Sequence, residues 1–203
     1  MFSWRAIGNH FVEMRSYFVI ALILLLAGMF VGASNEQLEA FLNSQLSGLE
    51  QFVKTADASS NPQLTMFFII FFNNVIKCIV VMYLGALFGI IPILFIFVNG
   101  MVMGYLFNMI HTSGENLFLI IVKGILPHGI IEIPALIVAC AYGLKFGTLG
   151  FRGIANLVRQ VPGIGLEYEK LAIRSVPITV ILIVSLLAAA VIESTLTVWL
   201  LGK

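Results

Sequence analysis

Two side chains that could do chemistry, His128 and Glu132, lie four residues apart inside an apolar segment. At that spacing they share one face of a helix, and either could accept a proton or bind a cation. Each ionisable group costs about 2.5–3.5 kcal/mol at a bilayer centre, so such groups are expected to be paired or to reach the interface. The polar residues expected at the same level, the middle of the membrane, are Asn73, Asn74, Lys77 and Asn99.

Three roles are open for this polar intramembrane cluster. In the first, Lys77 pairs with Glu132 and the asparagines complete a structural network, while His128 caps a backbone carbonyl that Pro134 frees. In the second, a two-fold dimer doubles His128 and Glu132 into two imidazoles and two carboxylates, a set that suits zinc or a related divalent metal. The third is a transporter or channel that moves an ion or small solute.

Two further ionisable residues, Lys123 and Glu193, are expected near the outer ends of their spans and at similar depth. We predict that they form an ion pair or reach the outer interface separately. Cys78 and Cys140 lie inside apolar runs and are interpreted as small buried hydrophobes. The sequence contains no His-Glu-x-x-His motif, no Gly-x-Ser-x-Gly motif and no phosphate loop. We therefore predict no enzyme and assign no catalytic residue.

The amino-acid composition indicates the class of protein that must position these side chains. The chain has 203 residues, of which 60% are hydrophobic and 10% charged, and its mean hydropathy is +1.05. So much apolar surface exceeds what one small soluble core can bury, which predicts an integral membrane protein. The net charge of +1 gives no reason to expect nucleic acid as a partner.

The apolar runs predict an all-α, polytopic fold in one transmembrane domain over residues 1–203. The run over 64–98 is too long for one span, so Gly85, Gly89 and Pro92 are taken to mark a turn. The run over 17–33 resembles a signal peptide, but we expect it to remain as a span. The five transmembrane helices are expected near 17–33, 64–84, 90–110, 117–143 and 176–198.

Charge predicts the orientation of these spans. Residues 1–16 and 144–175 are basic and are placed in the cytoplasm, whereas residues 34–63 are acidic and are placed outside the cell. The N-terminus is then cytoplasmic and the C-terminus outside, with Trp199 at the interface. Pro162, Gly163 and Gly165 are expected to break the basic region into two short helical pieces.

Within the acidic region, apolar residues recur at helical spacing and predict an amphipathic helix. They are Leu38, Phe41, Leu42, Leu49, Phe52 and Val53. A packed lid is the simpler interpretation of this helix, and a partner docking surface is the other. Docking is of interest because this is the one large segment expected outside the cell.

Glycines spaced by four residues predict close helix packing, because they let helix backbones approach. The pairs are Gly28 with Gly32, Gly85 with Gly89, Gly100 with Gly104, and Gly143 with Gly147. We expect each pair to pack within the chain rather than in a dimer interface, although a homodimer is expected overall.

The stretch from Gly124 to Ala135, Gly-Ile-Leu-Pro-His-Gly-Ile-Ile-Glu-Ile-Pro-Ala, resembles the stage II sporulation protein M family together with Phe72-Asn73-Asn74 and Asn99-Gly100. The resemblance covers roughly residues 15–200. It implies a cell membrane scaffold without enzymatic activity of its own, which recruits cell-wall hydrolases to the septum during engulfment. Many relatives occur in organisms that do not sporulate. By position the family's signature residues here are Asn73, Asn74, Asn99, Pro127, His128, Gly129, Glu132 and Pro134.

Overall fold

The computed structural model describes residues 4–34, 38–160 and 164–200, and these residues form helices without any strand. Five helical stretches are long and apolar enough to cross a membrane, which confirms the predicted fold class. The stretches are His10–Ser34, Pro62–Leu84, Ile90–Thr112, Leu117–Arg159 and Ile164–Leu200. Side chains that face outward from the bundle are strongly apolar: Phe30 is 74% exposed and Ile130 62% exposed. Such surfaces are stable in contact with lipid and not with water.

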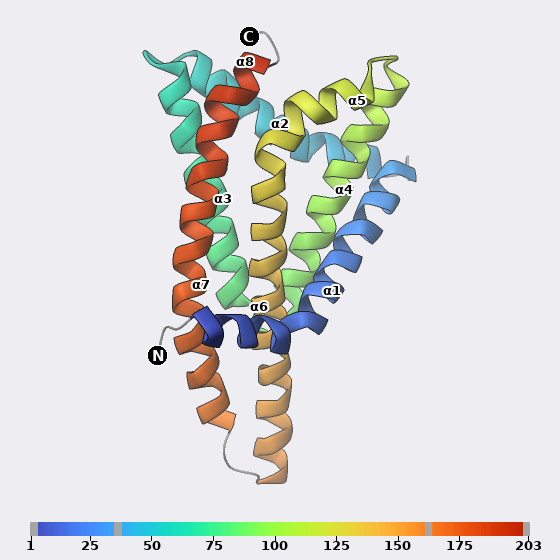
Figure 1. The fold of residues 1–203 in the computed structure, drawn as a ribbon. Coiled ribbons are helices and arrows are strands. Elements are labelled where there is room, and N and C mark those ends of the chain that lie inside the picture. The colour runs from blue at the N-terminus through green and yellow to red at the C-terminus, as the bar shows by residue number, and fades with distance from the viewer. Residues whose placement is uncertain (1–3, 35–37, 161–163, 201–203) are drawn as a thin grey trace.

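Helices α1 (Trp4–Ser34) and α4 (Ile90–Thr112) run side by side in the same direction (Figure 1). Their glycines interlock: a Cβ at Gly28 would meet the Phe97 carbonyl, and one at Gly104 would meet the Met29 carbonyl. Only glycine permits backbones to approach so closely. The glycine pairs of these two helices therefore pack against the backbone of the opposite helix within the chain, as predicted.

The other two glycine pairs interlock in the same way, between the end of α3 (Pro62–Leu84) and α6 (Leu126–Arg159). A Cβ at Gly85 would overlap the backbone of Gly143, and one at Gly147 would overlap the backbone of Gly89. Gly89 also has φ +73°, a left-handed conformation that favours glycine. The chain reverses at this point before α4 begins, which confirms the predicted turn.

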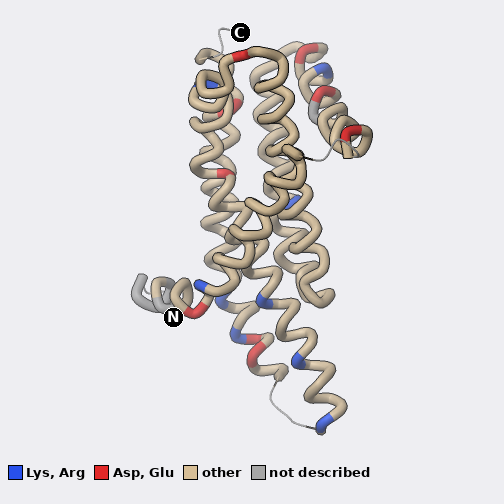
Figure 2. The backbone as a smooth tube through the Cα atoms, turned by 90° about the vertical axis from the view of Figure 1, so that its right-hand side faces the viewer, with Lys and Arg blue, Asp and Glu red and all other residues tan. Residues whose placement is uncertain are grey.

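The basic region is divided into two helical pieces near the predicted position, but each piece is continuous with a span and neither is a short separate helix. Helix α6 continues without a break to Arg159, and α7 (Ile164–Ile192) begins five residues later, so the two spans extend as a hairpin beyond the bundle (Figure 1). Pro162 and Gly163, two of the expected breakers, lie outside the described residues, and Gly165 lies within α7. Extension is favoured because residues 144–159 carry no proline, so the backbone hydrogen bonds of α6 are not interrupted. Figure 2 shows basic residues spaced along this hairpin.

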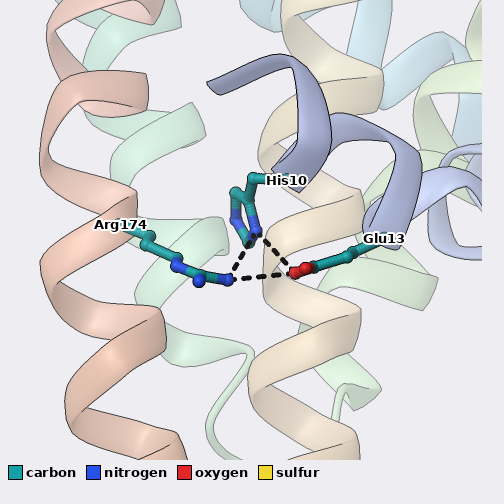
Figure 3. A network of polar contacts seen from close by, with 3 residues as sticks. All are labelled: His10, Glu13 and Arg174. Carbon is teal, nitrogen blue, oxygen red and sulfur yellow. Dashed lines mark hydrogen bonds and ion pairs between the residues drawn. The ribbon is translucent and has the colours of Figure 1, made fainter. Parts of the chain in front are cut away.

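The first turns of α1 lie across the bundle and are held against α7 by a polar network (Figure 3). Arg174 Nη1 donates to Glu13 Oε2 at 3.0 Å and lies 3.4 Å from His10 Nδ1. The His10 ring also meets the Tyr142 ring edge to face, with centroids 5.5 Å apart. These contacts join the first span to the fourth and the last at the end of the bundle that carries the hairpin.

Helix α2 (Glu39–Asp57) crosses the opposite end of the bundle (Figure 1), which confirms the predicted amphipathic helix. Leu42 and Ala56 are buried at 0% and 1% exposure and attach it to the spans. Tyr105 of α4 also donates a hydrogen bond to Asn43 Oδ1 at 2.9 Å. The apolar face is only partly covered: Leu38 is half-buried, whereas Phe41, Phe52 and Val53 remain exposed, and the Leu49 side chain lies outside the described residues.

The interior of the bundle is built on small residues of α6. Ala135, Ala139, Gly143 and Gly147 recur every four residues on one buried face, so neighbouring spans approach closely. Cys78 and Cys140 are buried and form no disulfide, which confirms that they act as small apolar side chains.

Candidate functional site

The start of α6 positions His128 and Glu132 on one helix face. Before it, α5 (Leu117–Ile120) and a π-helical segment, η2 (Ile121–Ile125), lead into Pro127. A π-helical turn inserts one extra residue and is frequent at functional sites. Figure 1 shows α5 slanting across the end of the bundle before α6 turns along it. His128 therefore lies two residues from the start of α6 and close to the α2 end, rather than in the middle of a straight span.

Glu193 joins these two side chains from the last span. It opens a second π-helical segment, η3 (Glu193–Thr197), between α7 and α8 (Val198–Leu200). One ligand atom each of His128, Glu132 and Glu193 lie within 4.8 Å of one another. All three side chains are half-buried. The sequence does not predict this contact, because it places Glu193 with Lys123 near the outer ends of the spans, either as an ion pair or with each side chain reaching the interface separately. No ion pair between those two is present among the described residues.

A cavity of about 340 Å³ surrounds the three side chains. Every member of the predicted polar cluster lines it, namely Asn73, Asn74, Lys77, Asn99, His128 and Glu132. Phe52 and Val53 of α2 line it as well, so the cavity reaches the end of the bundle that α2 covers. Three helices, α3, α4 and α6, bring these polar residues to one cavity, and η3 adds Glu193.

Hydrogen bonds fix the orientation of several of these groups. Asn74 Nδ2 donates to Glu132 Oε1 at 2.9 Å, and Asn73 Nδ2 donates to Asn74 Oδ1 at 3.1 Å. His128 Nδ1 lies 3.4 Å from the hydroxyl of Thr197. Asn99 takes a different role, because its Nδ2 donates to the carbonyl of Phe95 within its own helix at 2.7 Å.

Comparison with known proteins places the chain in a family. Residues 17–198 match the family described as stage II sporulation protein M. The chain belongs to that family. An uncharacterized protein of Methanocaldococcus jannaschii is 31% identical over 127 residues, which make up 62% of this chain and 52% of that protein. The chain therefore spans about half the length of this curated relative. No solved structure matches the chain.

The stage II sporulation protein M match includes part or all of each of the five spans and every member of the cluster. Lys77 is exposed and forms no ion pair among the described residues, so the expected Lys77–Glu132 pair is not made. Glu132 is instead held by an amide, and His128 contacts a side chain rather than a backbone carbonyl. The arrangement can hold a cation or a shared proton between an imidazole and two carboxylates.

Proposed function

We propose that the chain is a membrane scaffold that recruits peptidoglycan hydrolases on the extracytoplasmic side of the cell membrane. Membership of the stage II sporulation protein M family carries this proposal, since it makes the chain a multi-pass membrane protein of a sporulation-related family. A scaffold needs one part anchored in the bilayer and one surface presented to its partners. The bundle supplies the first, and α2 supplies the second.

The exposed face of α2 supports a docking role rather than that of a lid alone. Glu39, Glu50 and Asp57 are exposed on it, with Lys54 as the one basic residue. Lys54 and Glu50 lie 4.0 Å apart, and both side chains are at least 70% exposed, so this pair contributes little to stability. A net acidic surface attracts a partner whose contact face is basic, and it raises the rate of encounter.

Orientation follows from the distribution of charge over the two ends of the bundle. The hairpin end carries Lys145, Arg152, Arg159, Lys170 and Arg174, whereas the α2 end is acidic. Under the positive-inside rule the hairpin faces the cytoplasm, and α2 and the C-terminus face outward. Hydrolases that act on the cell wall work on that outer side.

Charge reversal on α2 tests the proposal. Deleting residues 38–55 would also remove Phe52 and Val53 from the cavity wall, so a loss of recruitment could come from a change in the cavity. The double variant Glu50→Lys, Asp57→Lys changes the surface charge and leaves the cavity wall in place. Both side chains are exposed, and a lysine near the end of α2 also suits the helix dipole. Glu115→Lys is the matched control, because Glu115 is exposed between α4 and α5 at the same end of the bundle.

The assay captures the tagged full chain from its own host in mild detergent and measures peptidoglycan hydrolysis by the captured material. We expect activity with the wild type and with the Glu115 control, and strongly reduced activity with the double variant. A wild-type chain that captures no hydrolase refutes the scaffold role. A double variant that captures as much as the wild type removes α2 as the docking surface.

A further inference from the structure

We propose that His128, Glu132 and Glu193 bind one divalent metal ion of the zinc class within a single chain. The observation is the convergence of one imidazole and two carboxylates, whose ligand atoms lie within 4.8 Å of one another. They come from two separate helices, α6 and the π-helical segment after α7, so the convergence is a property of the fold and not of a local motif.

The donor set suits zinc in number and type. Zinc accepts histidine nitrogen and carboxylate oxygen at about 2.0–2.2 Å, so ligands around one tetrahedral ion lie about 3.3 Å apart. Donor atoms that already lie within 4.8 Å need only small side-chain rotations to reach that separation. The cavity of about 340 Å³ leaves space for water as a fourth ligand, because one water occupies about 30 Å³.

A second layer of contacts supports the same assignment. Metal-binding histidines are usually held through their other ring nitrogen, and metal-binding carboxylates are themselves hydrogen-bonded. Here His128 Nδ1 contacts the Thr197 hydroxyl at 3.4 Å, which leaves Nε2 for a metal. Asn74 donates to one oxygen of Glu132 at 2.9 Å and leaves the other oxygen for a metal. Asn73 in turn donates to Asn74.

Charge balance also favours a cation. Two ionised carboxylates that converge inside an apolar bundle repel each other and lose hydration, and either a bound cation or a proton relieves that cost. Lys77 is the one basic residue that lines the cavity, and it forms no ion pair among the described residues. A divalent ion between Glu132 and Glu193 would neutralise both carboxylates at once.

The site differs from the metal site that the sequence predicted. That prediction placed His128 and Glu132 of two chains around a two-fold axis, whereas here the third ligand comes from the same chain. Binding of one ion per chain, rather than one per two chains, distinguishes the two arrangements. The inference does not depend on the recruitment of hydrolases, because it concerns the cavity and not the exposed face of α2.

The test uses the full chain in detergent, stripped of metal with a chelator and then titrated with Zn²⁺ alone. Bound zinc is measured by equilibrium dialysis and elemental analysis, and thermal unfolding is followed with and without Zn²⁺. The variants are Glu193→Gln and His128→Asn, which remove single ligands with little change of shape. Glu115→Gln is the control, because Glu115 is exposed outside the cavity.

We expect one zinc per wild-type chain, a rise in Tm on adding zinc, and loss of both in Glu193→Gln and His128→Asn. The control should behave as the wild type. Asn74→Ala, which removes the support of Glu132, should weaken binding about 10–100-fold. No zinc bound to the wild type, or undiminished zinc in Glu193→Gln, overturns the proposal. One zinc per two chains also overturns it, since the site would then be shared.

Discussion

A single methyl group added at Gly104 should destabilise the bundle strongly. The new Cβ would overlap the carbonyl of Met29 on α1. That atom belongs to backbone and cannot be displaced by a rotamer change, so α1 and α4 would have to separate. Gly104→Ala is therefore an overpacking substitution, a class that costs about 1–3 kcal/mol, and the backbone contact places it near the upper limit.

For a chain of this size, 1 kcal/mol corresponds to about 2–4 °C in Tm, so we expect Gly104→Ala to lower Tm by about 6–12 °C. Gly48→Ala is the matched control, because Gly48 lies in α2 and an added Cβ there meets nothing within 4 Å. Replacing a glycine inside a helix with alanine should stabilise the chain by about 0.5–1 kcal/mol. Both variants are measured by thermal unfolding in the same detergent.

Gly28→Ala provides a check on the mechanism, since its Cβ would meet the Phe97 carbonyl on the same helix pair. If both methyl groups act by separating α1 from α4, the double variant should lose less stability than the sum of the single losses. Additive losses would mean that the two glycines act independently. A Gly104→Ala protein that unfolds at the wild-type temperature would refute the close approach of these helices.

Two further substitutions report on the end of the bundle that carries the hairpin. Glu13→Gln removes the ion pair with Arg174, but both side chains are more than half exposed, so the loss should stay below about 1 kcal/mol by the same unfolding measurement. Tyr17→Phe removes a hydrogen bond to Thr148 Oγ1 at 2.9 Å and should cost about 0.5–1.5 kcal/mol. A larger effect of Glu13→Gln than of Tyr17→Phe would contradict the assignment of these two contacts.

Hydropathy and glycine spacing were sufficient to predict most of the fold. The five spans follow from the apolar runs, because a bilayer of fixed thickness limits each crossing. The glycine pairs predict close packing, although only the structure shows that α1 pairs with α4 and that α6 pairs with the turn after α3. The sequence does not predict that the two spans continue into the basic region, because charged residues indicate the end of a membrane span, whereas a helix can continue into water.

The candidate site was only partly predictable. Asn74, His128 and Glu132 were assigned to one level because they lie inside apolar runs, and the structure brings them to one cavity. The meeting of Glu193 with His128 is not predicted, because counting depth along straight spans places His128 in the middle of the membrane and Glu193 near the outer end. In the fold α5 slants across the end of the bundle, which brings His128 to the level of Glu193. The sequence does contain one indication that Glu193 belongs to a site. Glu193 is the one acidic residue in the apolar run 176–198, and a second polar residue, Ser194, follows it.

Helix α2 connects the two proposals, because its two faces serve different parts of the molecule. Phe52 and Val53 line the cavity that holds the proposed metal ligands, whereas Glu50 and Asp57 do not line it and form part of the acidic surface. A partner that moved α2 would therefore alter the wall of the cavity. Recruitment and zinc binding measured on the same Glu193→Gln chain separate the two roles: recruitment that survives the loss of zinc means that the metal stabilises the bundle without controlling the docking surface.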